Sequence, residues 1–147
     1  MQVLTEQELE AYDLYKDWLE EVEKTAMTKS YKMVLLSYML SRGVNHWFEP
    51  VTAETVAPYF VDYLTTKEYR RKIDSIGPDL KKAASLIGRM PMTKWSNSSK
   101  GKIRYADGEF ALNFEVNKDV NEIIFNWTRE ICAYRLHWYF EKKAERI

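Results

Sequence analysis

Cysteine, histidine, glycine and proline are all scarce in this chain of 147 residues, which has one cysteine, two histidines, five glycines and four prolines. The single cysteine, Cys132, excludes an internal disulfide. The two histidines, His46 and His137, lie far apart and have no cysteine or aspartate partner at the spacing of metal ligands. We therefore expect no metal site and no cofactor, and we interpret Cys132, in the middle of an apolar stretch, as a buried and unreactive thiol.

Long hydrophobic runs and catalytic motifs are missing as well. No apolar run approaches the roughly 18 residues of a membrane span, and residues 1–10 are acidic, whereas a signal peptide is basic and then apolar. The motifs GxxxxGK[ST], GxGxxG, HExxH and GxSxG do not occur. The sequence thus predicts a cytoplasmic protein that has no membrane segment and is not an enzyme.

What the chain does contain is an ordinary globular composition with an uneven distribution of charge. Hydrophobic residues make up 46% and aromatic residues 14%, which predicts a single domain over 1–147 with a ring-rich core. The 22 basic and 22 acidic side chains cancel, yet residues 1–25 hold eight acids and two bases, and residues 67–104 hold eleven bases and three acids. A clustered basic segment is typical of phosphate binding, although a solvated charged face gives the same composition.

Periodicity and capping signals predict a mainly α protein. Thr5 and Glu8 form a capping box at the start of an acidic, amphipathic helix that reaches Lys24. Further helices are predicted at 30–41, from Thr52 to about residue 64, at 79–90 and at 119–146, with Pro58 awkward inside the second of these. Between them we expect an extended piece at 44–48, a polar loop at 67–78, and a flexible, hydroxyl-rich loop at 91–101.

A β-hairpin is the clearest local signal in the sequence. Alternating apolar residues flank Asp107-Gly108, the dipeptide that favours a two-residue hairpin turn. From Ser30 onward the order is helix, extended piece, helix, helix, hairpin, which is the order of a winged helix-turn-helix. We predict a winged-helix-like core at 28–116 with the hairpin as its wing, flanked by the N-terminal helix (1–25) and a long C-terminal helix (119–146).

The basic surplus falls on the elements that would contact nucleic acid in that arrangement. The 79–90 helix would be the recognition helix, and the tryptophan of the following loop would stack on an unpaired base or, alternatively, anchor the loop to the core. The predicted nucleic-acid-binding residues are Lys81, Lys82, Ser85, Arg89, Lys94, Trp95, Lys100, Lys102, Arg104, Arg70, Arg71 and Lys72.

Several short segments are similar to a known family. They are Thr28-Lys29-Ser30-Tyr31-Lys32-Met33 followed by Leu35-Leu36, Phe60 with Tyr63, Pro91 followed by Lys94, Gly108-Glu109-Phe110-Ala111-Leu112, and Tyr134-Arg135 with Tyr139. Over residues 26–143 the chain resembles the C-terminal regions of bacterial DEAD/DEAH-box helicases of superfamily two, including those related to the helicase subunit of type III restriction systems. The resemblance implies a module of an ATP-dependent, nucleic-acid-remodelling machine.

Together these observations predict a non-catalytic DNA-binding accessory module of a bacterial helicase, or one associated with it. Its expected partners are duplex or single-stranded DNA and helicase motor domains in the same or a partner chain. The alternative is a protein-interaction or docking module within a helicase or restriction complex, in which the first and last helices form the contact surface.

Overall fold

The computed structural model describes residues 3–145 of the chain. These residues form a mainly helical protein with one small antiparallel sheet, as the sequence predicts. The elements in chain order are α1 (Glu6–Lys24), α2 (Tyr31–Ser41), β1 (Val51–Thr52), α3 (Ala53–Thr66), α4 (Glu68–Ile73), α5 (Leu80–Ile87), η1 (Gly88–Met92), α6 (Thr93–Ser98), β2 (Ile103–Ala106), β3 (Glu109–Leu112) and α7 (Asn121–Glu145). The predicted end of the last helix at Arg146 lies outside the described residues.

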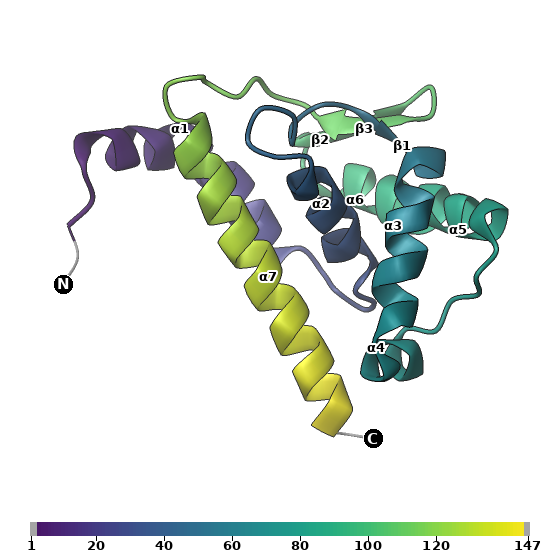
Figure 1. The fold of residues 1–147 in the computed structure, drawn as a ribbon. Coiled ribbons are helices and arrows are strands. Elements are labelled where there is room, and N and C mark those ends of the chain that lie inside the picture. The colour runs from purple at the N-terminus through teal and green to yellow at the C-terminus, as the bar shows by residue number, and fades with distance from the viewer. Residues whose placement is uncertain (1–2, 146–147) are drawn as a thin grey trace.

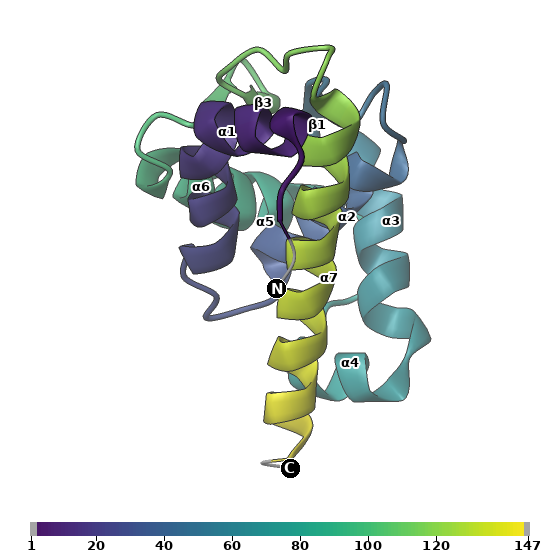
Figure 2. The same ribbon diagram turned by 90° about the vertical axis from the view of Figure 1, so that its left-hand side faces the viewer.

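Helix α7 runs the length of the molecule and organises the packing of the others. Helix α1 crosses its N-terminal half, whereas α2 and α4 lie against it on another side (Figures 1 and 2). The indole Nε1 of Trp18 in α1 donates to Thr128 Oγ1 in α7 over 3.0 Å, inside the core. Among the described residues, no helix is both long enough and apolar enough to span a membrane.

The start of α1 confirms the predicted capping box. Glu8 N donates to Thr5 Oγ1 over 3.1 Å, and Thr5 N donates to a Glu8 carboxylate oxygen over 3.0 Å. The helix buries Tyr15, Trp18 and Leu19, whereas Tyr12 is 49% exposed.

Helix α3 passes through Pro58 without ending there. Its N-terminus is capped by Thr52, whose Oγ1 accepts from Thr55 N over 3.2 Å, and the helix continues to Thr66. Pro58 is exposed, so its ring points away from the core. The predicted extended piece at 44–48 is wrong, because these residues form turns and the strand lies later, at β1.

Two predicted loops contain helices instead. The 67–78 connection includes α4, and the 91–101 loop, predicted to be flexible, includes α6. Pro91 does not close the preceding helix, because α5 continues into α6 through η1, a π-helical turn. A proline has no N–H to donate, and a widened turn absorbs that loss. Met92 and Trp95, both fully buried, fix this stretch to the core.

The sheet has the strand order β1-β3-β2, with both pairs antiparallel. In the β2–β3 hairpin, Ile103 lies opposite Leu112, and the turn residues Asp107 and Gly108 have φ angles of 54° and 78°. Two consecutive positive φ angles are what a tight hairpin turn of this type requires, which confirms the predicted Asp-Gly turn. Strand β1 pairs with β3 through Val51 and Phe110, and this pairing joins the hairpin to the start of α3.

A buried carboxylate ties three helices together. Asp74, directly after α4, is 1% exposed. It accepts hydrogen bonds from the backbone N–H of Ser30 over 2.9 Å, from the Ser30 hydroxyl, and from the Tyr139 hydroxyl over 2.8 Å. Ser30 precedes α2 and Tyr139 lies in α7, so this one side chain fixes the positions of α2, α4 and α7 relative to one another.

Candidate nucleic-acid interface

Helix α5 presents its basic residues to solvent because its other side is the apolar one. Ala83 and Ile87 are buried against the core. The predicted contacts of α5 and of the turn η1 that follows it are all exposed; they are Lys81, Lys82, Ser85 and Arg89. Asp79 caps the helix, with Oδ1 accepting from the backbone N–H groups of two of these residues over 2.8 and 3.1 Å. The cap satisfies donors that the first helical turn leaves unpaired.

A surface pocket of about 550 Å³ lies where α5 meets the hairpin. The residues that line it are Ala53, Glu54, Lys81, Ala84, Ser85, Gly88, Arg89, Thr93, Tyr105 and Gly108. The structure thus brings three of the predicted contacts together with the hairpin turn. The turn η1 lies close to the hairpin, because a Cβ on Gly88 would lie 3.0 Å from the Tyr105 hydroxyl.

The cations on this side of the molecule are not neutralised by the fold. Lys81, Lys82 and Arg89 make no ion pair with another residue of the part that the structure describes. Arg104 is exposed on β2, one position before the pocket residue Tyr105. These four side chains therefore remain able to meet anionic groups from outside the protein.

The basic residues that follow α5 have acidic neighbours from α1. Lys102 Nζ lies 3.9 Å from a carboxylate oxygen of Asp17. The pKa of Glu20 is lowered mainly by its hydrogen bond and ion pair with Lys24, and to a smaller extent by the charge of Lys100. The acidic N-terminal helix thus lies beside the 100–102 part of the basic segment.

Trp95 faces the interior. It is fully buried, its Nε1 donates to a Glu21 carboxylate oxygen over 2.9 Å, and its ring stacks on Trp18 with centroids 6.2 Å apart. A ring enclosed in this way is not open to an unpaired base. The structure therefore favours the alternative interpretation, in which Trp95 anchors its segment to the core. Lys94, next to it, is exposed.

The three basic residues of α4 are engaged in local contacts. The guanidinium of Arg70 lies 3.9 Å from the centroid of the Tyr63 ring. Arg71 donates to the backbone oxygen of Thr65 over 2.7 Å, and Lys72 pairs with Glu68 at 3.3 Å. They do not line the pocket beside α5.

Sequence reasoning missed several residues that shape the pocket. Glu54, at the start of α3, enters it because β1 pairs with the hairpin, which no local pattern reveals. Tyr105 carried a usable signal, because it alternates with Arg104 along β2 and therefore points to the opposite side of the strand.

Cys132 is buried as predicted; its thiol contacts the Met33 backbone oxygen at 3.3 Å, and burial raises its pKa to about 12.

Among the residues that the structure describes, no group of three His, Cys, Asp or Glu side chains is placed to hold a metal ion.

Comparison with other proteins adds no assignment to this geometry. No protein-family model matches the sequence, and neither the curated proteins nor the solved structures include one that matches it significantly.

Proposed function

We propose that this protein is a non-catalytic DNA-binding module that contacts DNA through α5 and the β2–β3 hairpin. The observation that carries the proposal is a set of exposed cations, Lys81 and Lys82 on α5 and Arg89 on η1, which have no acidic partner among the described residues. Lys81 and Arg89 line the pocket beside the hairpin. Exposed lysine and arginine side chains on one element bind phosphates and release counterions, which makes the affinity depend on salt.

The topology supports a winged-helix reading of the core. In that arrangement a strand between the first two helices pairs with the second strand of a C-terminal hairpin, and the third helix contacts DNA. The order α2, β1, α3, α5, β2, β3 and the strand order β1-β3-β2 agree with it. Helix α4 is an addition between α3 and α5, and π-helical η1 extends the third helix.

The test compares two triple variants of equal charge in an anisotropy titration with labelled duplex and single-stranded DNA. In K81A/K82A/R89A we expect the affinity to fall about tenfold or more at low salt, and the log K versus log salt slope to flatten by about one for each lost phosphate contact. The control, K67A/R71A/K72A, removes the same charge around α4 and should retain most of the binding.

Two results would count against this interface. Equal losses in the two variants would mean that binding follows net charge alone, and no binding by the unmodified protein at low salt would end the DNA-binding proposal. The ratio of duplex to single-strand affinity shows which form of DNA the surface prefers.

The proposed helicase association rests on the resemblance to the C-terminal regions of DEAD/DEAH-box helicases. We propose on that basis that the module works with a helicase motor in the same or a partner chain. Adding the purified module to such a motor should change its DNA-stimulated ATPase rate. An unchanged rate at saturating module would contradict the association.

A docking function is the second candidate, and exposed rings on α7 favour it. Tyr134 and Trp138 are 66% and 52% exposed and lie one helical turn apart, so they share a face of the helix. Exposed aromatic pairs are typical of protein contacts. Trp138→Glu should abolish a concentration-dependent dimer in sedimentation if this face pairs with a second copy. A protein that is monomeric at all concentrations would contradict self-association.

A further inference from the structure

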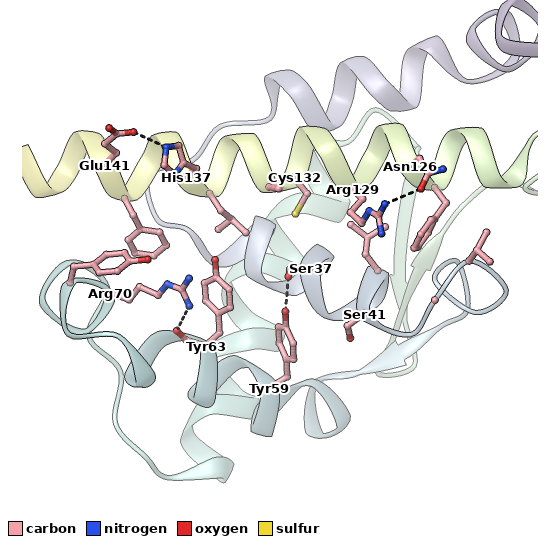
Figure 3. Close-up of a pocket in the computed structure, with 18 of the residues that line it drawn as sticks. Ser37, Ser41, Tyr59, Tyr63, Arg70, Asn126, Arg129, Cys132, His137 and Glu141 are labelled. Atoms are coloured by element: carbon pink, nitrogen blue, oxygen red, sulfur yellow. Dashed lines mark hydrogen bonds and ion pairs between the residues drawn. The ribbon is translucent and has the colours of Figure 1, made fainter. Parts of the chain in front are cut away.

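A large groove lies on the side of the molecule formed by α2, α3, α4 and α7, apart from the proposed DNA surface. Its volume is about 1020 Å³. Figure 3 shows α7 along one wall and the side chains of the other helices facing it. On α7 the lining residues run from Glu122 to Ala144, a distance of about 33 Å at 1.5 Å per helical residue. The groove is therefore longer than a small organic molecule, which would occupy only part of it.

Aromatic and aliphatic side chains make up half of the residues that line the groove. The rings that line it are Tyr59, Tyr63, Tyr69, Phe125 and Phe140. Tyr59 and Tyr63 stack with centroids 6.1 Å apart, and Tyr59 shares a 2.6 Å hydrogen bond with Ser37. Figure 3 shows the Cys132 sulfur pointing from α7 into this space. Such a surface is suited to a flat, apolar ring.

Arg70 places a positive charge at one end of this apolar surface. Its guanidinium lies 3.9 Å from the ring centroid of Tyr63, 5.5 Å from that of Tyr69 and 6.0 Å from that of Phe140. Nη1 donates to the Tyr63 backbone oxygen over 3.2 Å. The rings and this hydrogen bond hold the side chain in place, so little freedom remains to be lost when a ligand binds.

The hydrogen-bonding capacity of Arg70 is not used up. Its Nε is buried and has no acceptor among the described residues. No carboxylate in that part of the chain forms an ion pair with this residue. A buried donor without an acceptor is uncommon in folded proteins and calls for an explanation. An acceptor supplied by a ligand is one, because the guanidinium edge matches the two oxygens of a carboxylate.

The other charged residues of the groove differ from Arg70. Arg129 also lies over a ring, that of Phe125 at 5.4 Å, but its side chain is exposed and donates to the Asn126 side chain over 3.2 Å. Glu141 pairs with His137 at 2.9 Å. Figure 3 places Arg129 toward the opposite end from Arg70. Arg70 is thus the groove cation whose unpartnered donor is buried, and Tyr69, 44% exposed, is the most exposed of the three rings around it.

We propose that the groove binds a small aromatic carboxylate, with the carboxylate held by Arg70 and the ring lying against Tyr63, Tyr69 and Phe140. The proposal does not depend on DNA binding, because the groove and the α5 surface share no residue. The ligand class follows from a planar, stacked cation next to a ring-lined apolar wall.

The test uses ¹H–¹⁵N NMR with 2-naphthoate as the probe and neutral 2-naphthamide as its matched control. We expect 2-naphthoate at millimolar concentration to shift amide resonances of the groove residues and the Nε–H resonance of Arg70, which R70M identifies by its loss. R70M should weaken 2-naphthoate binding about tenfold or more, the equivalent of 1.4 kcal/mol or more. R71M is the control for charge, since Arg71 does not line the groove.

A second variant covers a failure of R70M to fold. R70K keeps the charge but lacks the Nε–H and the planar fork, so it should also bind 2-naphthoate more weakly than the unmodified protein. Equal shifts from 2-naphthamide, no shift with 2-naphthoate, or unchanged affinity in folded R70M or R70K would overturn the proposal. Arg70-dependent shifts with single-stranded DNA and none with 2-naphthoate would assign Arg70 to a nucleic-acid surface instead and would also overturn it.

Discussion

The side chains of two neighbouring basic segments, one at 67–74 and one at 79–89, lie in different surroundings in the fold. In the first, Arg70 lies among aromatic rings, Arg71 and Lys72 contact residues nearby, and Asp74 is the centre of a buried hydrogen-bond network. In the second, Lys81, Lys82 and Arg89 are exposed, and the aspartate at its start only caps a helix. The first segment contributes to the packing of the protein, whereas the cations of the second are exposed. Charge counted along the sequence does not separate the two.

The largest expected effect contrasts the two aspartates. Asp74→Ala removes the buried acceptor of the Ser30 donors and leaves the Tyr139 hydroxyl only a 3.4 Å contact with the Thr28 backbone oxygen, so we expect the free energy of unfolding to fall by about 3 kcal/mol. Asp79→Ala removes only a helix cap, for which about 1 kcal/mol is typical. Urea unfolding of both variants measures the difference, and equal losses would contradict the contrast.

The next effect is a loss of stability at alkaline pH, caused by two tyrosines that lie beside the first segment, Tyr63 and Tyr139. Burial and the contact with Asp74 raise the pKa of Tyr139, and burial raises the pKa of Tyr63 to about 12. The unfolded chain then releases these protons at lower pH than the folded protein, so the contribution of both groups is complete below about pH 10 and declines as the pH rises above it.

Tyr139→Phe tests this assignment. The variant loses the hydrogen bond to Asp74, so we expect it to be about 1 kcal/mol less stable at neutral pH. Its stability should also fall less steeply above pH 10, because one of the titrating groups is gone. Urea midpoints measured across the pH range provide the comparison, and a steeper alkaline decline in the variant would show that Tyr139 is not responsible.

The smallest expected effect concerns the stability of the second segment. Because Lys81, Lys82 and Arg89 are exposed and unpaired within the described structure, replacing each by alanine should change the free energy of unfolding by no more than about 0.5 kcal/mol. Thermal and urea unfolding of the triple variant would measure this. A large loss would place these side chains in the packing, as in the first segment, and would remove the distinction between the two.

Local signals in the sequence were sufficient for the elements whose partners are close in the chain. The capping box of Thr5 and Glu8 spans three positions, and the hairpin follows from Asp107-Gly108 and its alternating flanks. Mainly helical structure and the exposed basic face of α5 are equally local. For these features, capping and turn signals identify where the element begins or turns, and periodicity identifies the side that it buries.

Features that depend on distant partners were not predictable in the same way. The acceptor of Trp95 is Glu21, 74 positions away, and Asp74 meets Ser30 and Tyr139 at separations of 44 and 65. A hydroxyl-rich stretch looks like a flexible loop until Trp95 is known to enter the core. Charge alone predicts a nucleic-acid surface at Arg70, whereas the rings of α3 and α7 that lie near it come from elsewhere in the chain.

The helical stretch Leu80–Ser98 is continuous but contains the π-helical turn η1. Side chains before and after this turn therefore do not follow the spacing of one regular α-helix. One residue corresponds to about 100° of rotation about the helix axis. The extra residue in a π-turn therefore rotates the side chains that follow it, relative to their positions in a regular α-helix. The exposed basic face of α5 and the buried Trp95 of α6 are therefore not tied to the fixed angular spacing that one continuous α-helix would impose on them.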